Sequence, residues 1–130
     1  MKLLLDTQVF IWLINNDGRL GKVTLEILRD PTNQLNISYF SVYEMIIKAS
    51  IGKLEYDNSV IDDLPKMGIE LLLPDAESLD NYSIYNPENK DPFDNALITV
   101  ARKERCLLVT SDPKILSVSV QGLGLINALK

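Results

Sequence analysis

The stretch Lys2-Leu3-Leu4-Leu5-Asp6-Thr7 decides the fold, because a short leucine run ends in an acidic residue just before an amphipathic segment. A short apolar run bounded by polar residues is typical of a buried strand. Residues 7–14 then carry apolar side chains at helical spacing, so we expect a strand followed directly by a helix. The apolar face of this helix is predicted to consist of Val9, Phe10, Leu13 and Ile14.

The rest of the chain alternates between the same two kinds of segment. We expect further strands at 35–39, 69–73, 107–109 and 123–126. We expect helices at 22–29, from Ser41 to near Gly52, and at 60–66, 76–82, 92–104 and 113–116, with a polar loop at 86–90. Strands that alternate with helices indicate βαβ units and a mainly parallel sheet. The predicted fold class is therefore α/β.

Length and composition favour one globular domain spanning residues 1–130. A chain of 130 residues can bury one core and is too short for two domains. Its 46% hydrophobic and 24% charged residues are ordinary for a globular protein. No apolar run approaches the roughly 20 residues of a membrane helix. The N-terminus does not resemble a secretory signal, so we expect a mature chain that begins at Met1 and stays in the cytoplasm, with no membrane partner.

The types of side chain present exclude several kinds of site. The chain has no histidine, which excludes Ser-His-Asp and Cys-His catalysis and His-rich zinc sites. We interpret the single cysteine, Cys106, as a small buried hydrophobic residue. Any metal must therefore be held by oxygen, which favours magnesium or manganese. The net charge of -5 argues against a broad basic surface for nucleic acid, but a bound metal would neutralise part of an acidic site.

Four acidic residues stand where expected helices begin, and they are spread over nearly the whole chain. They are Asp6, Glu44, Asp94 and Asp112. Each has a local explanation, because side-chain oxygens at a helix start accept hydrogen bonds from free backbone N–H groups. Asp6 could cap the first helix, and Ser41-x-x-Glu44 fits a capping box. Asp91 and Pro92 fit the cap and the first position of a helix that has Asp94 at its third position, and Asp112-Pro113 repeats this pattern.

Capping alone does not require these helix starts to converge. If the strands lie side by side, the carboxylates meet at the sheet edge where open α/β sheets bind ligands. Gathered carboxylates repel one another and raise their own pKa values unless a cation lies among them. A divalent ion would relieve that repulsion, activate water and stabilise charge at phosphorus. Signatures of dinucleotide and P-loop binding do not occur in the sequence.

A set of short motifs occurs in a fixed order from Leu3 to about Ile126. The motifs are Leu4-Leu5-Asp6-Thr7 with Phe10 and Trp12-Leu13, Arg19-Leu20, Ser38 with Ser41-Val42-Tyr43-Glu44, Ile47-Lys48, Gly52-Lys53-Leu54, Asp91-Pro92-Phe93-Asp94 with Ala96-Leu97-Ile98, and Leu108-Val109-Thr110-Ser111-Asp112. In this order the chain resembles PIN-domain ribonucleases, in particular the VapC-like toxins of toxin–antitoxin pairs.

The resemblance implies a three-layer α/β/α fold with a parallel sheet and an acidic pocket for magnesium or manganese. By position, the pocket acids would be Asp6, Glu44, Asp94 and Asp112. Nearby hydroxyls would be Thr7, Ser41 and Ser111, and Asp91 would be a secondary acid or a cap. Members of the family cut RNA at phosphodiesters, and many are dimers inhibited by an antitoxin that covers the site.

Some positions depart from the common family pattern while the four acids are intact. Gln8 and Lys90 stand where histidine is frequent, Tyr43 where tryptophan is frequent, and Asn95 where arginine is usual. Lys90 keeps a cation beside the pocket that could contact a phosphate. From its spacing, Lys48 would form an i,i+4 ion pair with Glu44. Trp12 is predicted to pack in the core or a dimer interface.

The resulting hypothesis is a metal-dependent endoribonuclease that acts as the toxin of a toxin–antitoxin pair, with a cognate antitoxin and a homodimeric state. Asp6, Asp94 and Asp112 would hold the ion, and Glu44 would complete its shell or orient the attacking water. Two alternatives stay open. One is a catalytically silent PIN-like module that binds a partner protein, and the other is a structure-specific DNA nuclease.

Overall fold

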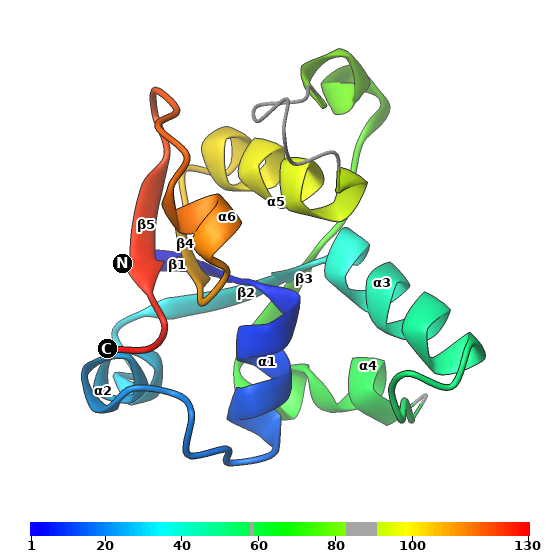
Figure 1. The fold of residues 1–130 in the computed structure, drawn as a ribbon, viewed down its shortest axis with the longest axis vertical. Coiled ribbons are helices and arrows are strands. Elements are labelled where there is room, and N and C mark those ends of the chain that lie inside the picture. Colours follow the sequence, from blue (N-terminus) through cyan, green and yellow to red (C-terminus); the bar gives the residue numbers. More distant parts are fainter. Residues whose placement is uncertain (58, 83–90) are drawn as a thin grey trace.

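The computed structural model of the protein describes residues 1–57, 59–82 and 91–130 (Figure 1). Its strands are β1 (Lys2–Leu5), β2 (Gln34–Ser38), β3 (Ile69–Leu72), β4 (Leu107–Thr110) and β5 (Gly124–Asn127). Its α-helices are α1 (Thr7–Ile14), α2 (Lys22–Arg29), α3 (Tyr39–Ser50), α4 (Ser59–Asp63), α5 (Pro92–Lys103) and α6 (Pro113–Leu116). Two 3-10 helices are η1 (Pro65–Met67) and η2 (Ala76–Asn81). The loop predicted at 86–90 lies outside the described residues.

The strands pair in the order β3-β2-β1-β4-β5, and every pairing in the described sheet is parallel, which confirms the predicted sheet type. In the centre, Leu5 of β1 is paired with Ile37 of β2 on one side and Val109 of β4 on the other. The chain adds β2 and β3 on one side of β1, then crosses to add β4 and β5 on the other. The point where this direction reverses therefore lies between the carboxyl ends of β1 and β4, where open α/β sheets bind ligands.

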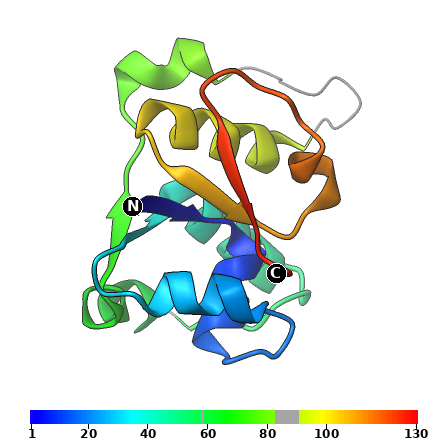
Figure 2. The same cartoon turned by 90° about the vertical axis from the view of Figure 1, so that its left-hand side faces the viewer.

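Two hydrophobic cores cover the two faces of the sheet. Leu3 and Leu5 point into a core shared with α1, α2 and α3, whereas Leu4 points to the opposite face, into a core built mainly on α5. This alternation follows from the two-residue period of a strand, and the leucine run is apolar throughout because both faces are buried. Figure 2 shows α5 on one face of the sheet with α1 and α2 on the other. The three-layer α/β/α arrangement is confirmed.

The start of α3 differs from the prediction. The helix begins at Tyr39 instead of Ser41, and residue 39 is not the last residue of the preceding strand. The cause is the cap: the Ser38 hydroxyl accepts a 3.1 Å hydrogen bond from the Phe40 backbone N–H. Ser41 therefore lies inside the helix, and the predicted capping box with Glu44 is wrong.

Two other expectations need correction. The helix predicted at 60–66 is divided into α4 and η1, because Pro65 has no N–H with which to continue the α-helical hydrogen bonds. Ile14 is 39% exposed and does not belong to the buried face of α1, whereas Trp12 is 7% exposed and lies in the core. Val9 and Trp12 are three positions apart and so share one face of the helix. The Arg19 guanidinium covers the Trp12 ring, 5.1 Å from its centroid.

Other boundaries agree with the prediction to within one or two residues, which is the ordinary uncertainty of a helix or strand end. Cys106 is buried, as predicted, with 4% of its surface exposed, and this burial raises the pKa of its thiol. Among the helices in the described part of the chain, none is long and apolar enough to cross a membrane.

Candidate functional site

A cavity of about 330 Å³ lies at the carboxyl ends of β1 and β4. Its lining brings together acidic residues from four separate segments of the chain. The lining residues are Asp6, Thr7, Gln8, Ile11, Glu44, Lys48, Asp91, Asp94, Ser111, Asp112 and Pro113. We call this space the acidic cavity. All four acids singled out in the sequence line it.

Asp6 is the most buried of these acids, with 8% of its surface exposed. It follows β1 directly, and its backbone N–H donates a 2.9 Å hydrogen bond to the Val109 carbonyl of β4. One carboxylate oxygen accepts from the Gln8 backbone N–H at 3.1 Å, which caps α1. The other accepts from the Thr110 hydroxyl at 2.5 Å. Asp6 is therefore both a helix cap and a cavity residue.

Burial is the largest cause of a raised pKa at Asp6, because it removes water from the charged form. The hydrogen bonds from Thr110 and Gln8 act in the opposite direction and favour the carboxylate. The nearby charges of Glu44 and Asp112 raise the pKa further. Three acids from three elements thus interact electrostatically at this edge of the sheet.

Glu44 is held from both sides. The Thr7 hydroxyl donates to Oε1 at 2.8 Å, and the Lys48 ammonium lies 2.9 Å from Oε2. The predicted i,i+4 ion pair of Lys48 is confirmed. The hydrogen bond with Glu44 is the main cause that raises the pKa of Lys48, and the charges of Asp91 and Asp6 add to it. Lys48 therefore interacts with several carboxylates of the acidic cavity.

The first turn of α5 supplies two more acids. Asp91 caps this helix by accepting from the backbone N–H groups of Phe93 at 2.8 Å and Asp94 at 3.4 Å. Asp94 lies in the same first turn, half-buried, after the Pro92 that starts the helix.

Asp112 completes the acidic lining from the segment between β4 and α6. It caps α6 by accepting from the Lys114 backbone N–H at 2.8 Å. Its own backbone N–H donates to the Thr110 hydroxyl at 3.1 Å. Thr110 therefore links Asp6 and Asp112, the acids that follow the two central strands.

The structure separates the other predicted site residues into three groups. Thr7, Ser111 and Asp91 line the acidic cavity. Ser41 does not line it: this side chain is buried inside α3, and its hydroxyl has no hydrogen-bond partner among the described residues. Lys90 lies outside the described residues.

Thr110 and Lys48 contribute to the acidic cavity in ways that the sequence did not reveal. The signal for Thr110 would have been the sheet register: Leu5 pairs with Val109, so the next residues, Asp6 and Thr110, meet. Because one sequence does not reveal the order of the strands, the pairing of β1 with β4 could not be predicted. From the sequence, Lys48 was recognised only as a partner of Glu44, since its approach to Asp6 and Asp91 depends on how α3 packs against α1 and α5.

The side chains of the acidic cavity fit a hard divalent cation by their chemistry, because carboxylate and hydroxyl oxygens are the ligands that magnesium and manganese prefer. Among residues 1–57, 59–82 and 91–130, however, no group of three or more acidic or cysteine side chains is arranged so that it could hold an ion. Asp6, Glu44 and Asp112 instead bond to neighbouring groups of the chain. To share an ion, the carboxylates would have to turn toward one another.

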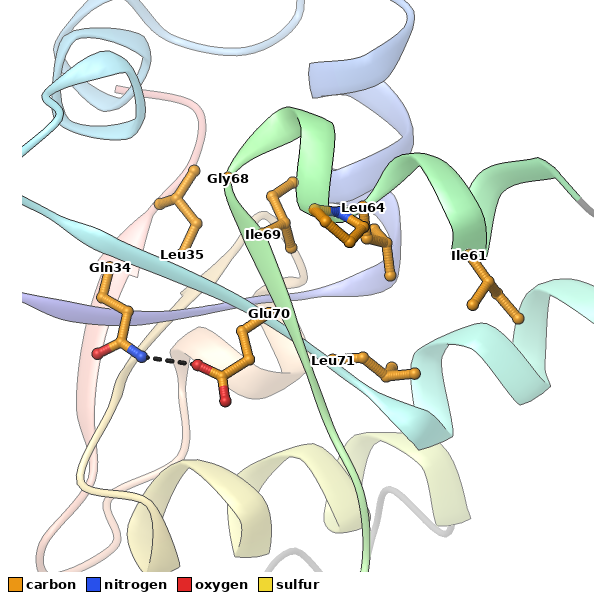
Figure 3. A pocket seen from close by; sticks show the side chains of 9 residues that line it. Gln34, Leu35, Ile61, Leu64, Gly68, Ile69, Glu70 and Leu71 are labelled. Carbon is orange, nitrogen blue, oxygen red and sulfur yellow. Dashed lines mark hydrogen bonds between the residues drawn. The ribbon is translucent and has the colours of Figure 1, made fainter.

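Another cavity, of about 410 Å³, lies beside the edge strand β3 (Figure 3). Its lining is mostly apolar, with Leu35, Leu64 and Ile69 among the residues that face it. Gln34 donates a 3.0 Å hydrogen bond to the carboxylate of Glu70 across neighbouring strands. Glu70 is the one ionisable side chain in this lining as described, so the acidic cavity is the better candidate for chemistry.

Comparison with known proteins gives a consistent result. The model of the PIN domain family matches residues 3–120. Similar solved structures include VapBC2 from Rickettsia felis bound to a promoter DNA fragment, at 22% identity, 98% coverage of both chains and a TM-score of 0.71. VapBC-1 from nontypeable Haemophilus influenzae is 21% identical, with both chains covered completely and a TM-score of 0.68. A toxin–antitoxin complex from Klebsiella pneumoniae is 16% identical, with 97% of both chains covered and a TM-score of 0.61. No curated protein matches the chain.

Proposed function

The chain belongs to the PIN domain family, whose members are nucleases, and we propose that it is a divalent-metal-dependent endoribonuclease that hydrolyses RNA phosphodiesters. The observation that carries this proposal is the lining of the acidic cavity. Asp6, Glu44, Asp94 and Asp112 come from four segments, yet all four border one cavity at the carboxyl edge of the sheet. Helix capping accounts for Asp6, Asp91 and Asp112 one at a time, but it does not account for their common location.

In the proposed site, Asp6, Asp94 and Asp112 would hold magnesium or manganese, and Glu44 would complete the shell or orient the attacking water. A bound ion would activate water and stabilise the charge that develops at phosphorus. Ser111 and Asp91 border the same space and would support the carboxylates or bound water.

The hydrogen bonds of the chain itself would position these acids. Thr110 and the Gln8 amide hold Asp6, and Thr7 holds Glu44. Groups that hold a ligand in one orientation raise the effectiveness of a metal site, because less ordering is needed when the ion and substrate bind. Lys90 remains a predicted phosphate contact, although it lies outside the described residues.

We also propose the role of a toxin with a cognate antitoxin. Support comes from the similar solved structures, which are toxin–antitoxin complexes from Rickettsia felis, Haemophilus influenzae and Klebsiella pneumoniae. The antitoxin would cover the acidic cavity, and the chain would act in the cytoplasm as a homodimer of a single PIN-like domain, residues 1–130.

The direct test is cleavage of single-stranded RNA in magnesium by the unmodified chain and by Asp6→Asn and Asp94→Asn. Each substitution should lower the rate by more than about 100-fold, since even residues behind metal ligands contribute about 10- to 100-fold. Asp62→Asn, which changes an exposed acid on α4, is the matched control and should retain the rate. Folded variants that cut at the unmodified rate, or full activity in excess EDTA, would refute the proposal.

A further inference from the structure

A second cavity of about 400 Å³ adjoins the acidic cavity. The two cavities share the side chains of Glu44, Lys48 and Asp91 as a common wall. The rest of the second cavity is lined by Ile47, Ile51, Lys53, Pro92 and Phe93. A polymer with one unit in the acidic cavity would therefore place its neighbouring unit in this second, largely apolar space.

Aromatic rings continue from the second cavity along α3. The Phe93 ring lies 6.2 Å from the Tyr43 ring at an interplanar angle of 57°, and Tyr43 stacks on Tyr39 at 6.3 Å and 18°. Tyr43 is 49% exposed and Tyr39 is 45% exposed. Exposed aromatic faces beside a charged site are the surfaces on which unpaired bases stack, because every base has an aromatic face.

The end of α3 places a second lysine at this cavity. Gly52 has a φ of +75°, and the backbone N–H groups of Gly52 and Lys53 donate to the carbonyls of Ala49 and Lys48. This is a Schellman ending, which turns the chain back at a residue where only glycine is unstrained. Lys53 is thereby directed to the cavity that Lys48 lines from within the helix. Lys48 is paired with Glu44 at this cavity, so Lys53 is the lysine of its lining that lies outside that ion pair.

We propose that the second cavity binds an unpaired nucleobase of the RNA strand, next to the phosphodiester in the acidic cavity, with Lys53 beside the adjoining phosphate. This inference rests on the proposed function, because it takes RNA as the substrate. Ile47, Ile51 and Phe93 offer the apolar surface that a base face needs, and Lys53 offers the charge that its phosphate needs. Bases within a duplex are stacked and paired, so the cavity selects single-stranded RNA.

The test compares two fluorescein-labelled strands of equal charge, one of eight uridines and one of eight abasic ribonucleotides. Binding is measured by anisotropy in magnesium, with Asp6→Asn in every protein so that the strands stay intact. Without further substitution, the protein should bind the uridine strand at least about fivefold more tightly than the abasic strand, as base stacking commonly provides. Phe93→Leu and Ile51→Ser should reduce this ratio toward one. Lys53→Gln should weaken the binding of both strands by the same factor.

Matched controls are Ile61→Ser, an apolar residue 40% exposed on the other cavity, and Lys66→Gln, a lysine on η1. Both should leave the ratio and the affinities unchanged. The inference would be overturned if the Asp6→Asn protein bound the uridine and abasic strands equally well. It would also be overturned if Phe93→Leu and Ile51→Ser left the ratio of the two affinities unchanged. If Phe93→Leu disrupts a dimer but leaves the ratio of the two affinities unchanged, the aromatic rings bind a second copy of the chain and the inference is wrong. If the ratio responds but the chain without Asp6→Asn cuts no RNA, the base site stands and only the proposed function fails.

Discussion

The Thr110 hydroxyl donates a 2.5 Å hydrogen bond to the buried Oδ2 of Asp6, although the two residues are 104 positions apart in the chain. The same hydroxyl accepts from the backbone N–H of Asp112. One side chain at the end of β4 therefore fixes two acids of the acidic cavity, one that follows β1 and one that follows β4. This link depends on the parallel pairing of β1 with β4.

Thr110→Val should destabilise the protein by about 1–3 kcal/mol, because valine keeps the shape but leaves a buried carboxylate without its donor. The free energy of unfolding, measured by urea denaturation, tests this expectation. The matched control is Thr32→Val, which removes a hydroxyl bonded at 2.7 Å to Asp30 in an exposed position. Water replaces that bond, so its loss should cost less than about 0.5 kcal/mol. Equal costs at the two positions would contradict the importance of burial at Asp6.

The raised pKa of Asp6 makes stability depend on pH. Since the folded-state pKa lies above the ordinary value of 3.8, this group favours folding below that value and loses the contribution as pH rises through the folded pKa. Asp6→Asn should therefore gain stability relative to the unmodified chain over the pH range above the ordinary value of 3.8, in EDTA. Urea unfolding across this range measures the difference, and a difference that shrinks as pH rises would contradict it.

Asp17→Asn is the control with the opposite sign. Asp17 has its pKa lowered to about 2, chiefly by the hydrogen bond from the Arg19 side chain. Its carboxylate favours folding above the ordinary value, so Asp17→Asn should lose stability relative to the unmodified chain as pH rises. The change should be small because water screens an exposed pair.

Lys48→Gln should increase the affinity for manganese by at least about fivefold. The Lys48 ammonium lies 2.9 Å from Oε2 of Glu44 and would repel a cation bound there. Two unit charges about 4 Å apart interact by about 1 kcal/mol in water, and a divalent ion doubles that repulsion. Calorimetric titration measures the change. Lys66→Gln, which removes the 3.7 Å ion pair with Asp63, should leave the affinity unaltered. A weaker affinity in Lys48→Gln would mean that this lysine supports the metal site instead of competing with it.

The helix starts were predictable from the sequence where they depend on residues close to them in the chain. Asp6, Asp91 and Asp112 cap helices as the sequence indicated, because a cap involves only nearby backbone groups. The start of α3 was not predicted, since Ser38 and Ser41 are both good candidates and the choice depends on where β2 ends. The link from Thr110 to Asp6 was also missed, because it follows from strand order.

Substitution of the two serines tests this correction. Ser38→Ala should lower the free energy of unfolding by about 1 kcal/mol, because it removes the cap of α3. Ser41→Ala should be neutral or stabilising, since its buried hydroxyl has no partner among the described residues. Urea denaturation of both variants decides the matter. A larger loss in Ser41→Ala would show that Ser41 is the residue that supports the helix.

The account depends on the four acids acting as one metal site, and calorimetric titration of manganese into the folded protein tests this most directly. We predict binding by the unmodified chain and by the control Asp62→Asn, with affinity at least about tenfold lower in Asp94→Asn. Asp94 suits this test because it follows the capping residue Asp91 and is not itself the cap. No manganese binding by the unmodified chain, or equal affinity in Asp94→Asn, would contradict the account.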